Sequence, residues 1–480
     1  MDNVQENIAS KPVVKFANYA FKVLRKIEAQ IVRFNRMSFE ELKKYQAANR
    51  YSSFYHLTSP SGKYLPYGEI GNDCFNELCE LILKYDAGLK GKFSFDLTKK
   101  TLQSIFVDFF VKDLKAVERE SCEPYFIKVI CAMVSTAREF EHHVPCNFFV
   151  FDSPDTFWIG PVKFTKTEVF LQVFKNSLNE DSQGETLSTL DYYEGRSMEY
   201  YREFPWVASV KVGQCDFETS YEWALFHCNT ALNVTRVLFG ANSTKWVRLG
   251  YDLGSPLSSA KIWSEDSKIK CSIASRVRAP TGPTNWYDFL NNEALEIKHI
   301  LGSVISHTSK FGQYSELSNR LLDAVNWFGD AAKESSPAAS VLKYVTAIER
   351  LYFGSFSSSF KKRFVSRVSK VLVDFECHCA SGSDSVLNEV YEARSTLVHG
   401  AVSPSLGDVM WPNWKAEEIA SQCIFCAIQL YGLFSETLYP QSSQELEECF
   451  LQYEEKGIEW FMLEVERKRH DAKFSREAEC

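Results

Sequence analysis

The sequence contains no long apolar run. Its longest runs, such as Cys423–Leu430, fall well short of the roughly 20 residues that an α-helix needs to cross a bilayer. The amino-terminal residues MDNVQENIASK also lack the basic segment and the apolar segment of a secretory signal. These absences argue against a membrane protein and against export, and they predict a cytoplasmic protein with no membrane partner.

Motifs of several common enzyme classes are absent as well. The Gly-Lys pair at residues 91–92 lacks the preceding glycine and the following Ser or Thr of a phosphate-binding loop. No His-Glu-x-x-His motif occurs. The 14 cysteines form no disulfide framework and are interpreted as reduced core thiols.

Two cysteine clusters could supply zinc ligands on paper. The cluster Cys377–Cys379 is too closely spaced for ordinary chelation, and Cys423 and Cys426 fit the apolar face of one helix. We therefore expect neither a metal site nor a cofactor.

Positive charge is in deficit. There are 54 Lys and Arg residues against 62 Asp and Glu residues, which gives a formal net charge of −8. This balance argues against a surface that attracts nucleic acid everywhere. If RNA is a partner, it must meet a local basic patch.

Up to about residue 285 the chain alternates helix-type and strand-type patterns. An amphipathic helix is predicted over Val13–Arg36, where apolar residues recur at three- and four-residue steps. Apolar and β-branched segments bounded by turn residues predict strands within Phe157–Phe164, Glu168–Phe174 and Trp206–Val212. A further helix is predicted over Phe217–Phe239.

Beyond a linker candidate at Arg276–Pro283 the patterns are helical. Ser336 followed by Pro337 is a strong start signal for one of these helices. The predicted fold class is therefore α+β, with a mixed α/β region followed by an all-α bundle. We expect three parts: a mixed region over residues 1–285 that contains a helical subregion 1–145, a helical domain over 286–440, and a charged carboxy-terminal helix over 441–480.

One helix of the predicted bundle carries a cation where its pattern calls for an apolar residue. Leu387, Tyr391, Arg394 and Val398 recur at three- and four-residue steps, so Arg394 lies on the core-facing stripe. A buried charge without a partner costs several kcal/mol. We therefore expect Arg394 to meet a carboxylate, a protein interface or an anionic ligand. Gly400 is the natural end of this helix.

Residues 391–400, YEARSTLVHG, resemble the Arg-x(4 to 6)-His signature of the HEPN ribonucleases, and in particular their Apea-like branch. Upstream, Val341–Phe353 is similar to the second helix of that branch, and Arg363–Leu372 is similar to its third. The resemblance covers roughly Glu316–Pro440, about a quarter of the chain.

The same Arg/His spacing occurs twice more. Arg50 and His56 follow a polar segment, and Arg138 and His143 enclose charged residues where the family has Leu-Val. Neither pair is interpreted as the motif.

The resemblance implies an activity, an assembly and a setting. HEPN ribonucleases bring two motifs together across a dimer interface into one composite site, which leaves a cyclic phosphate on the RNA product. The Apea-like branch implies bacterial defence against phage, with a nuclease held quiet until a phage-derived trigger acts. On this resemblance we expect a homodimer that cuts RNA, with residues 1–285 as a sensor or restraint.

The chemistry of RNA cleavage also suits Arg394 and His399. The 2′-hydroxyl of RNA can attack the neighbouring phosphorus without a metal if a proton acceptor or donor and a cation are supplied. Histidine titrates near neutral pH, so His399 suits proton transfer. The guanidinium of Arg394 is always charged and matches phosphate geometry. Ser395 follows the arginine, where family members often carry asparagine.

Further charges interrupt the apolar stripes of neighbouring helices. Glu349 and Arg367 are expected to form a buried pair that either braces the bundle or orients Arg394. Lys361, Lys362 and Arg363 occupy a first helical turn, where the helix dipole disfavours cations, so they guide RNA phosphates or form an ordinary basic surface. The candidate catalytic residues are Arg394, His399, Ser395 and Glu349, and the candidate RNA-binding residues are Lys361, Lys362, Arg363 and Arg367.

Two functions follow from this reading. The first is a metal-independent RNA endonuclease of the HEPN type. The alternative is a catalytically inactive HEPN module that serves dimerisation or RNA binding.

Overall fold

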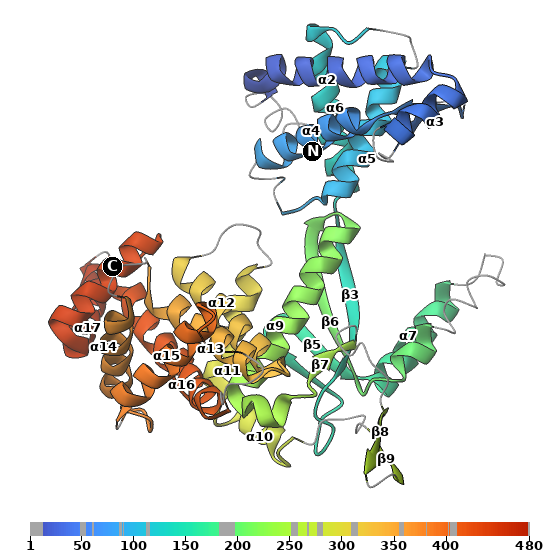
Figure 1. Cartoon of the computed structure of the whole chain (residues 1–480). Helices are drawn as coiled ribbons and strands as arrows, with labels where there is room; N and C mark the ends of the chain where they lie inside the picture. The colour runs from blue at the N-terminus through green and yellow to red at the C-terminus, as the bar shows by residue number, and fades with distance from the viewer. Residues whose placement is uncertain are drawn as a thin grey trace. The chain divides into compact units, whose positions relative to one another are not determined.

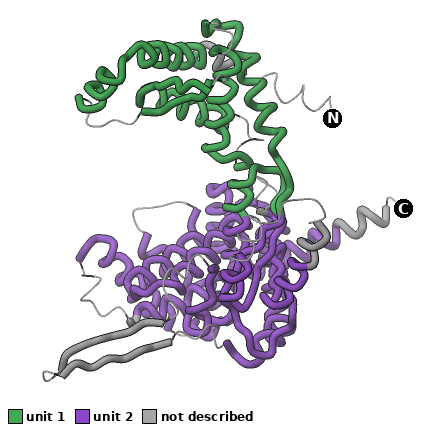
Figure 2. Tube along the Cα trace, turned by 90° about the vertical axis from the view of Figure 1, so that its right-hand side faces the viewer, with its two compact units in different colours: residues 1–140, 212–223 green, residues 141–211, 224–480 purple. Residues whose placement is uncertain are grey.

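The computed structural model describes residues 13–48, 54–59, 62–85, 89, 91–111, 116–181, 197–250, 258–265, 268–275, 282–308, 315–354, 360–380, 382–401, 403 and 410–478. The chain forms two compact units, residues 1–140 with 212–223 and residues 141–211 with 224–480 (Figure 2). The division after residue 140 lies near the end of the expected helical subregion 1–145. It does not lie near residue 285, where we expected a domain boundary.

The first unit is mainly helical. In α2 (Val13–Asn35), Ala20, Val23 and Ile27 are buried while Lys22 and Arg25 are exposed, which confirms the predicted amphipathic helix. Its other elements are α3 (Phe39–Ala48), the hairpin β1 (Tyr55–Thr58) and β2 (Tyr64–Tyr67), α4 (Glu69–Tyr85), α5 (Phe95–Phe106), a π-helical turn Val107–Val111, a 3-10 turn Arg119–Ser121 and α6 (Cys122–Thr136).

A five-stranded sheet has the strand order β4-β5-β6-β3-β7. The pairs β4/β5, β5/β6 and β3/β7 are antiparallel. The strands are β3 (Arg138–Asn147), β4 (Thr156–Ile159), β5 (Val162–Lys166), β6 (Trp206–Cys215) and β7 (Arg248–Leu249). A separate hairpin joins β8 (Ser258–Glu265) to β9 (Lys268–Ser275).

Most of the segments named above for this region are confirmed, and the prediction for Glu168–Phe174 is wrong. Phe157–Phe164 forms the β4–β5 hairpin and Trp206–Val212 lies in β6, while α9 (Phe217–Thr244) includes the predicted helix. Glu168–Phe174 is part of the helix α7 (Thr167–Asp181) and not a strand. Phe170 and Phe174 are four residues apart and stack at 5.9 Å between ring centroids, which is the spacing of one helical face.

The helical bundle follows in the second unit (Figure 1). At its centre α13 packs against α12, α15 and α16. As predicted, α13 begins after Ser336, whose hydroxyl accepts a hydrogen bond from the N–H of Ala339, with Pro337 as the first helical residue. The helices are α10 (Trp286–Asn291), α11 (Leu295–Thr308), α12 (Glu316–Lys333), α13 (Pro337–Tyr352), α14 (Phe360–Asp374), α15 (Ser383–Val398), α16 (Met410–Thr437) and α17 (Ser443–Ala478).

Aromatic packing explains why the sheet and the bundle share one unit. Trp286 of α10 is fully buried and lies 5.2 Å from the Phe148 ring and 5.3 Å from the Phe157 ring. Its indole N–H donates a hydrogen bond to the carbonyl oxygen of Phe151. Most of the linker candidate Arg276–Pro283 lies outside the described residues. The tryptophan thus joins the helices directly to the segment that follows β3.

The carboxy-terminal helix is also an integral part of the bundle. α17 contains Gly457 at φ 78°, where its helical backbone is interrupted. On α17, Leu446, Phe450 and Tyr453 are fully buried, so this helix covers part of the core. The helix predicted over residues 441–480 is present as α17, and its apolar face packs against α14 and α16.

The architecture is α+β with a helical carboxy-terminal region, as the sequence predicted. Among the described helices, none is both long enough and apolar enough to cross a bilayer.

Candidate active site

The helix α15 ends where the sequence predicted. Gly400 has φ 69°, and its N–H donates a hydrogen bond to the carbonyl oxygen of Leu397 at 3.2 Å. The N–H of Ala401 donates to the carbonyl oxygen of Thr396 at 2.9 Å. These two bonds form the Schellman arrangement that closes a helix at a left-handed glycine. His399 is the last residue before this turn.

Arg394 lies on the inward face of α15, and a carboxylate meets it there. Leu387 and Tyr391 of the same face are buried. The Arg394 Nη2 atom lies 3.3 Å from Oε2 of Glu349 on α13, and the two side chains are 19% and 14% exposed. The Arg394 guanidinium also lies 5.8 Å from the centroid of the Tyr391 ring. Of the three partners expected for Arg394, the structure therefore shows the carboxylate.

The Glu349 carboxylate is only partly satisfied by this contact. Its Oε1 atom is buried and forms no hydrogen bond to any residue that the structure describes. Burial raises the pKa of the Glu349 carboxyl above its ordinary value, although the charge of Arg394 and its hydrogen bond oppose the shift. One buried acceptor atom of Glu349 therefore has no hydrogen-bond partner among the described residues.

His399 and Ser395 lie at the carboxyl end of α15 and are not part of the Arg394–Glu349 ion pair. The His399 side chain is exposed, and its backbone N–H donates to the carbonyl oxygen of Ser395 at 3.0 Å. The Ser395 side chain is half-buried. Within the described part of the chain, the structure records no contact of either side chain with Arg394 or Glu349. The His399 imidazole is therefore accessible to a ligand.

Arg367 has partners that the sequence analysis missed. Its guanidinium is fully buried and donates to Glu447 at 2.8 Å, to Glu454, and to the carbonyl oxygen of Tyr352 at 2.7 Å. The expected Glu349–Arg367 pair and the expected contact of Arg367 with RNA are therefore both wrong. The seven-residue spacing of Glu447 and Glu454 places both carboxylates on one face of α17, and that spacing was visible in the sequence.

The predicted basic turn Lys361–Arg363 has one residue in the buried network and two lysines nearer the surface. Arg363 lies 3.4 Å from Glu447 and over the ring of Phe353 at 5.3 Å, so it belongs to the buried network. Lys362 is exposed, and Lys361 lies 3.5 Å from Glu392 of α15. The two lysines alone remain candidates for contact with RNA.

Lys361 and Lys362 line a depression of about 670 Å³ between α14 and α15. Ser366, Asp384 and Asn388 contribute polar groups to the same depression. Phe360 and Val365 add apolar surface, so the depression has a mixed lining that includes two cations.

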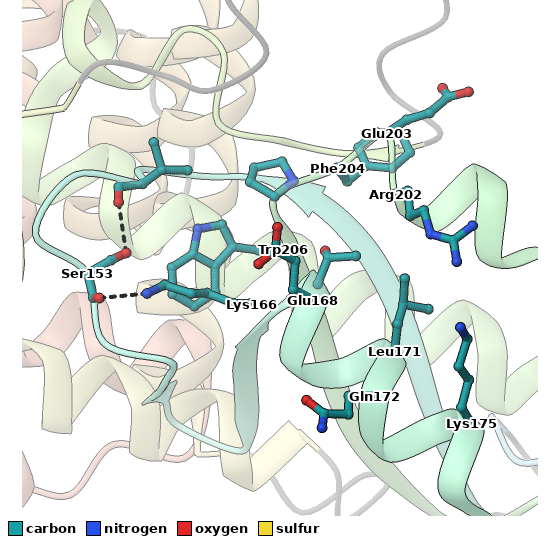
Figure 3. Close-up of a pocket in the computed structure, with 13 residues that line it drawn as sticks. Ser153, Lys166, Glu168, Leu171, Gln172, Lys175, Arg202, Glu203, Phe204 and Trp206 are labelled. Carbon is teal, nitrogen blue, oxygen red and sulfur yellow. Dashed lines mark hydrogen bonds between the residues drawn. The ribbon is translucent and has the colours of Figure 1, made fainter.

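A second concavity, of about 760 Å³, lies beside the sheet at the start of α7 (Figure 3). Lys166 lines it and donates hydrogen bonds to Asp155 at 3.1 Å and to the carbonyl oxygen of Ser153 at 3.0 Å. Arg202 and Lys175 lie on one side, whereas Glu168 and Glu203 add negative charge to the lining. Because the lining carries both cations and carboxylates, it does not indicate a particular class of ligand. None of the candidate residues predicted from the sequence lines this pocket.

In the described residues, no group of three or more His, Cys, Asp or Glu side chains is arranged to hold a metal ion. Comparison of the chain with protein-family models, with curated proteins and with solved structures gave no match. The function must therefore be argued from the geometry of the site itself.

Proposed function

We propose that the chain is a metal-independent RNA endonuclease of the HEPN type, with its active site at the carboxyl end of α15. One observation carries the proposal: a half-buried arginine, Arg394, is held by a single carboxylate five residues before the exposed His399. The site thus combines a fixed cation with an imidazole, the side chain that most often serves as a general acid or base.

The proposed reaction needs only groups of this kind. The RNA 2′-oxygen forms a bond to the adjacent phosphorus while the bond from phosphorus to the 5′-oxygen breaks. His399 takes up the 2′-hydroxyl proton or supplies a proton to the leaving 5′-oxygen, and water makes the other of these two proton transfers. Arg394 stabilises the negative charge that develops on the phosphate oxygens. The products are a 2′,3′-cyclic phosphate and a 5′-hydroxyl.

The Arg394–Glu349 contact favours a positioning role for Glu349. Charge-assisted hydrogen bonds are usually about 2.7–2.9 Å long, and this contact is longer, at 3.3 Å. A second carboxylate would hold the guanidinium more firmly, as Glu447 and Glu454 do for Arg367. Arg394 is therefore oriented by Glu349 yet keeps donors for a phosphate.

The same contact supports the second candidate function. A guanidinium that is 19% exposed and paired with a carboxylate can also serve only to complete the bundle. The chain would then be an inactive HEPN module for dimerisation or RNA binding. Binding of RNA without cleavage would distinguish this module from the enzyme.

The direct experiment uses the purified full-length protein and single-stranded RNA in excess EDTA, with DNA of the same sequence as the control. We expect cleavage of the RNA and none of the DNA, because DNA lacks the 2′-hydroxyl. Loss of RNA cleavage in EDTA would contradict metal independence. Cleavage of both nucleic acids would contradict the proposed attack.

We also propose that the active form is a homodimer that joins two α15 helix ends. Val398, next to His399, is 53% exposed and offers an apolar contact there. The change Val398→Asp should shift the protein towards the monomer in light scattering at micromolar concentration and should lower cleavage. Val373→Asp is the matched control, because Val373 on α14 is 54% exposed. A wild-type monomer that cleaves RNA would contradict this assembly.

By the same resemblance, we propose that the nuclease serves bacterial defence against phage. The region before the bundle would act as a sensor that restrains the nuclease until a phage-derived trigger binds.

Lys361 and Lys362 are expected to guide RNA towards the site without taking part in the chemistry. Each phosphate contact that is removed should flatten the dependence of log affinity on log salt by about 0.7 for single strands. The double change of both lysines to alanine should weaken binding most at low salt and leave the maximal cleavage rate unchanged.

The control for this prediction is the same double change at Lys43 and Lys44, an exposed lysine pair on α3. Salt titrations of RNA binding by fluorescence anisotropy provide the measurement. Equal salt slopes for wild type and the Lys361/Lys362 variant would place the RNA path elsewhere.

A further inference from the structure

Two thiols from different elements of the bundle lie in contact. The Sγ atoms of Cys377, in the turn after α14, and Cys426, on α16, are 3.1 Å apart. This separation is within roughly 1 Å of the bond length of a disulfide, about 2.05 Å. Cys377 is half-buried, whereas Cys426 is 2% exposed. Every cysteine whose side chain the structure describes is a free thiol.

We propose that Cys377 and Cys426 form a site of reversible oxidation by hydroperoxides such as hydrogen peroxide. With hydrogen peroxide, in the first step the Cys377 sulfur attacks one peroxide oxygen, the O–O bond breaks, and a sulfenic acid and water form. In the second step the Cys426 sulfur attacks the Cys377 sulfur, the S–O bond breaks, and a second water leaves. Two thiols and one peroxide thus become one disulfide and two waters.

Exposure sets the order of these steps. The oxidant reaches the half-buried Cys377 first, and the buried Cys426 then resolves the sulfenic acid. Burial raises the pKa of the Cys426 thiol, and the neighbouring cysteines add to the shift. Because the thiolate is the nucleophile, the resolving step should be slow at neutral pH and faster in alkaline buffer.

Two further cysteines compete for the same oxidant. Cys379 is half-buried and lies two residues after Cys377, and Cys423 is fully buried one turn before Cys426. Burial raises the pKa of the Cys379 thiol to about 11, which makes it a poor nucleophile at neutral pH. The recorded contact between two sulfur atoms joins Cys377 to Cys426, so this pair is the expected product.

The disulfide would enclose the chain from Cys377 to Cys426. That segment contains all of α15, including Arg394 and His399. A covalent link across this loop restricts its conformations in the unfolded chain. Oxidation would therefore act on the segment that carries the candidate active site, although the chemistry of the pair does not depend on the proposed function.

The test treats the native full-length protein with hydrogen peroxide, alkylates the remaining thiols after denaturation, and maps the peptides by mass spectrometry. We expect one cross-linked product between the tryptic peptides that contain Cys377 and Cys426, with loss of two alkylation sites. Dithiothreitol should restore both sites.

Variants identify the pair. Cys377→Ser and Cys426→Ala should each abolish the cross-link, whereas Cys379→Ser and Cys423→Ala should keep it. Cys377→Ser changes a half-buried side chain, so it remains informative if the buried Cys426 variant fails to fold. A Cys377–Cys379 link, or no disulfide before the sulfinic acid appears, would overturn the proposal.

Discussion

Replacement of His399 by alanine is expected to lower the rate of RNA cleavage by about 10²–10⁴-fold, the usual contribution of a general acid or base. The stability of the protein should stay within about 0.5 kcal/mol of wild type, since the side chain is exposed. Single-turnover cleavage rates and denaturation curves measure the two quantities. Loss of activity without loss of stability is the signature of a residue that acts in the chemistry.

His378→Ala is the matched control, because His378 is an exposed histidine in the same bundle. It should leave the cleavage rate unchanged. Arg394→Lys complements the test at the cation, because lysine keeps the charge but loses the planar fork that matches phosphate. Arg394→Ala is less informative, since it also leaves the buried Glu349 without its partner. Wild-type cleavage by the His399 variant would contradict its proposed role.

Replacement of Arg367 by alanine is expected to lower the free energy of unfolding by about 3–5 kcal/mol, the usual loss when one partner of a buried ion pair is removed. The change leaves the buried Glu447 with only the more distant cation Arg363, at 3.4 Å, and removes the ion-pair partner of the more exposed Glu454. Chemical denaturation measures the effect. The control is Lys370→Ala on the same helix, whose pair with Asp374 is 33% and 18% exposed and should contribute about 0–1 kcal/mol.

This network also predicts a pH dependence. Burial alone would raise the pKa of the Glu447 carboxyl, but Arg367 and the N–H of Gly354 more than offset it, so the pKa lies below its ordinary value. A lowered pKa in the folded state stabilises the protein above the pKa of the unfolded state, and this contribution is lost as the pH falls through the folded value. The Arg367 variant should therefore lose less stability than wild type on acidification. Equal acid sensitivity would contradict the network.

Local features of the fold were predictable from the sequence. The start of α13 at Ser336-Pro337 and the end of α15 at Gly400 depend on residues within one turn of each boundary. The Glu168–Phe174 segment was predicted wrongly, because a short apolar run fits a strand or a helix equally well. The helical assignment depends on the length of α7, which continues to Asp181 and is too long for a typical strand.

The candidate site was predictable in part, because the pattern along each helix shows which positions should be apolar. The position of Arg394 on an apolar stripe required a partner, and Glu349 stood out as a charge on the edge of another stripe. The sequence could not assign the pairs, since Glu349 and Arg394 are 45 residues apart and Arg367 and Glu447 are 80 apart. Which cation meets which carboxylate depends on how α13, α14, α15 and α17 pack.

The most direct test of the central claim is the chemistry of the RNA ends that the purified full-length protein leaves in EDTA. The account predicts fragments with a 2′,3′-cyclic phosphate and a 5′-hydroxyl, and no cleavage at a linkage whose 2′-hydroxyl has been replaced by hydrogen. Fragments with 5′-phosphates, or cleavage at the 2′-deoxy linkage, would contradict attack by the RNA itself and with it the proposed roles of Arg394 and His399.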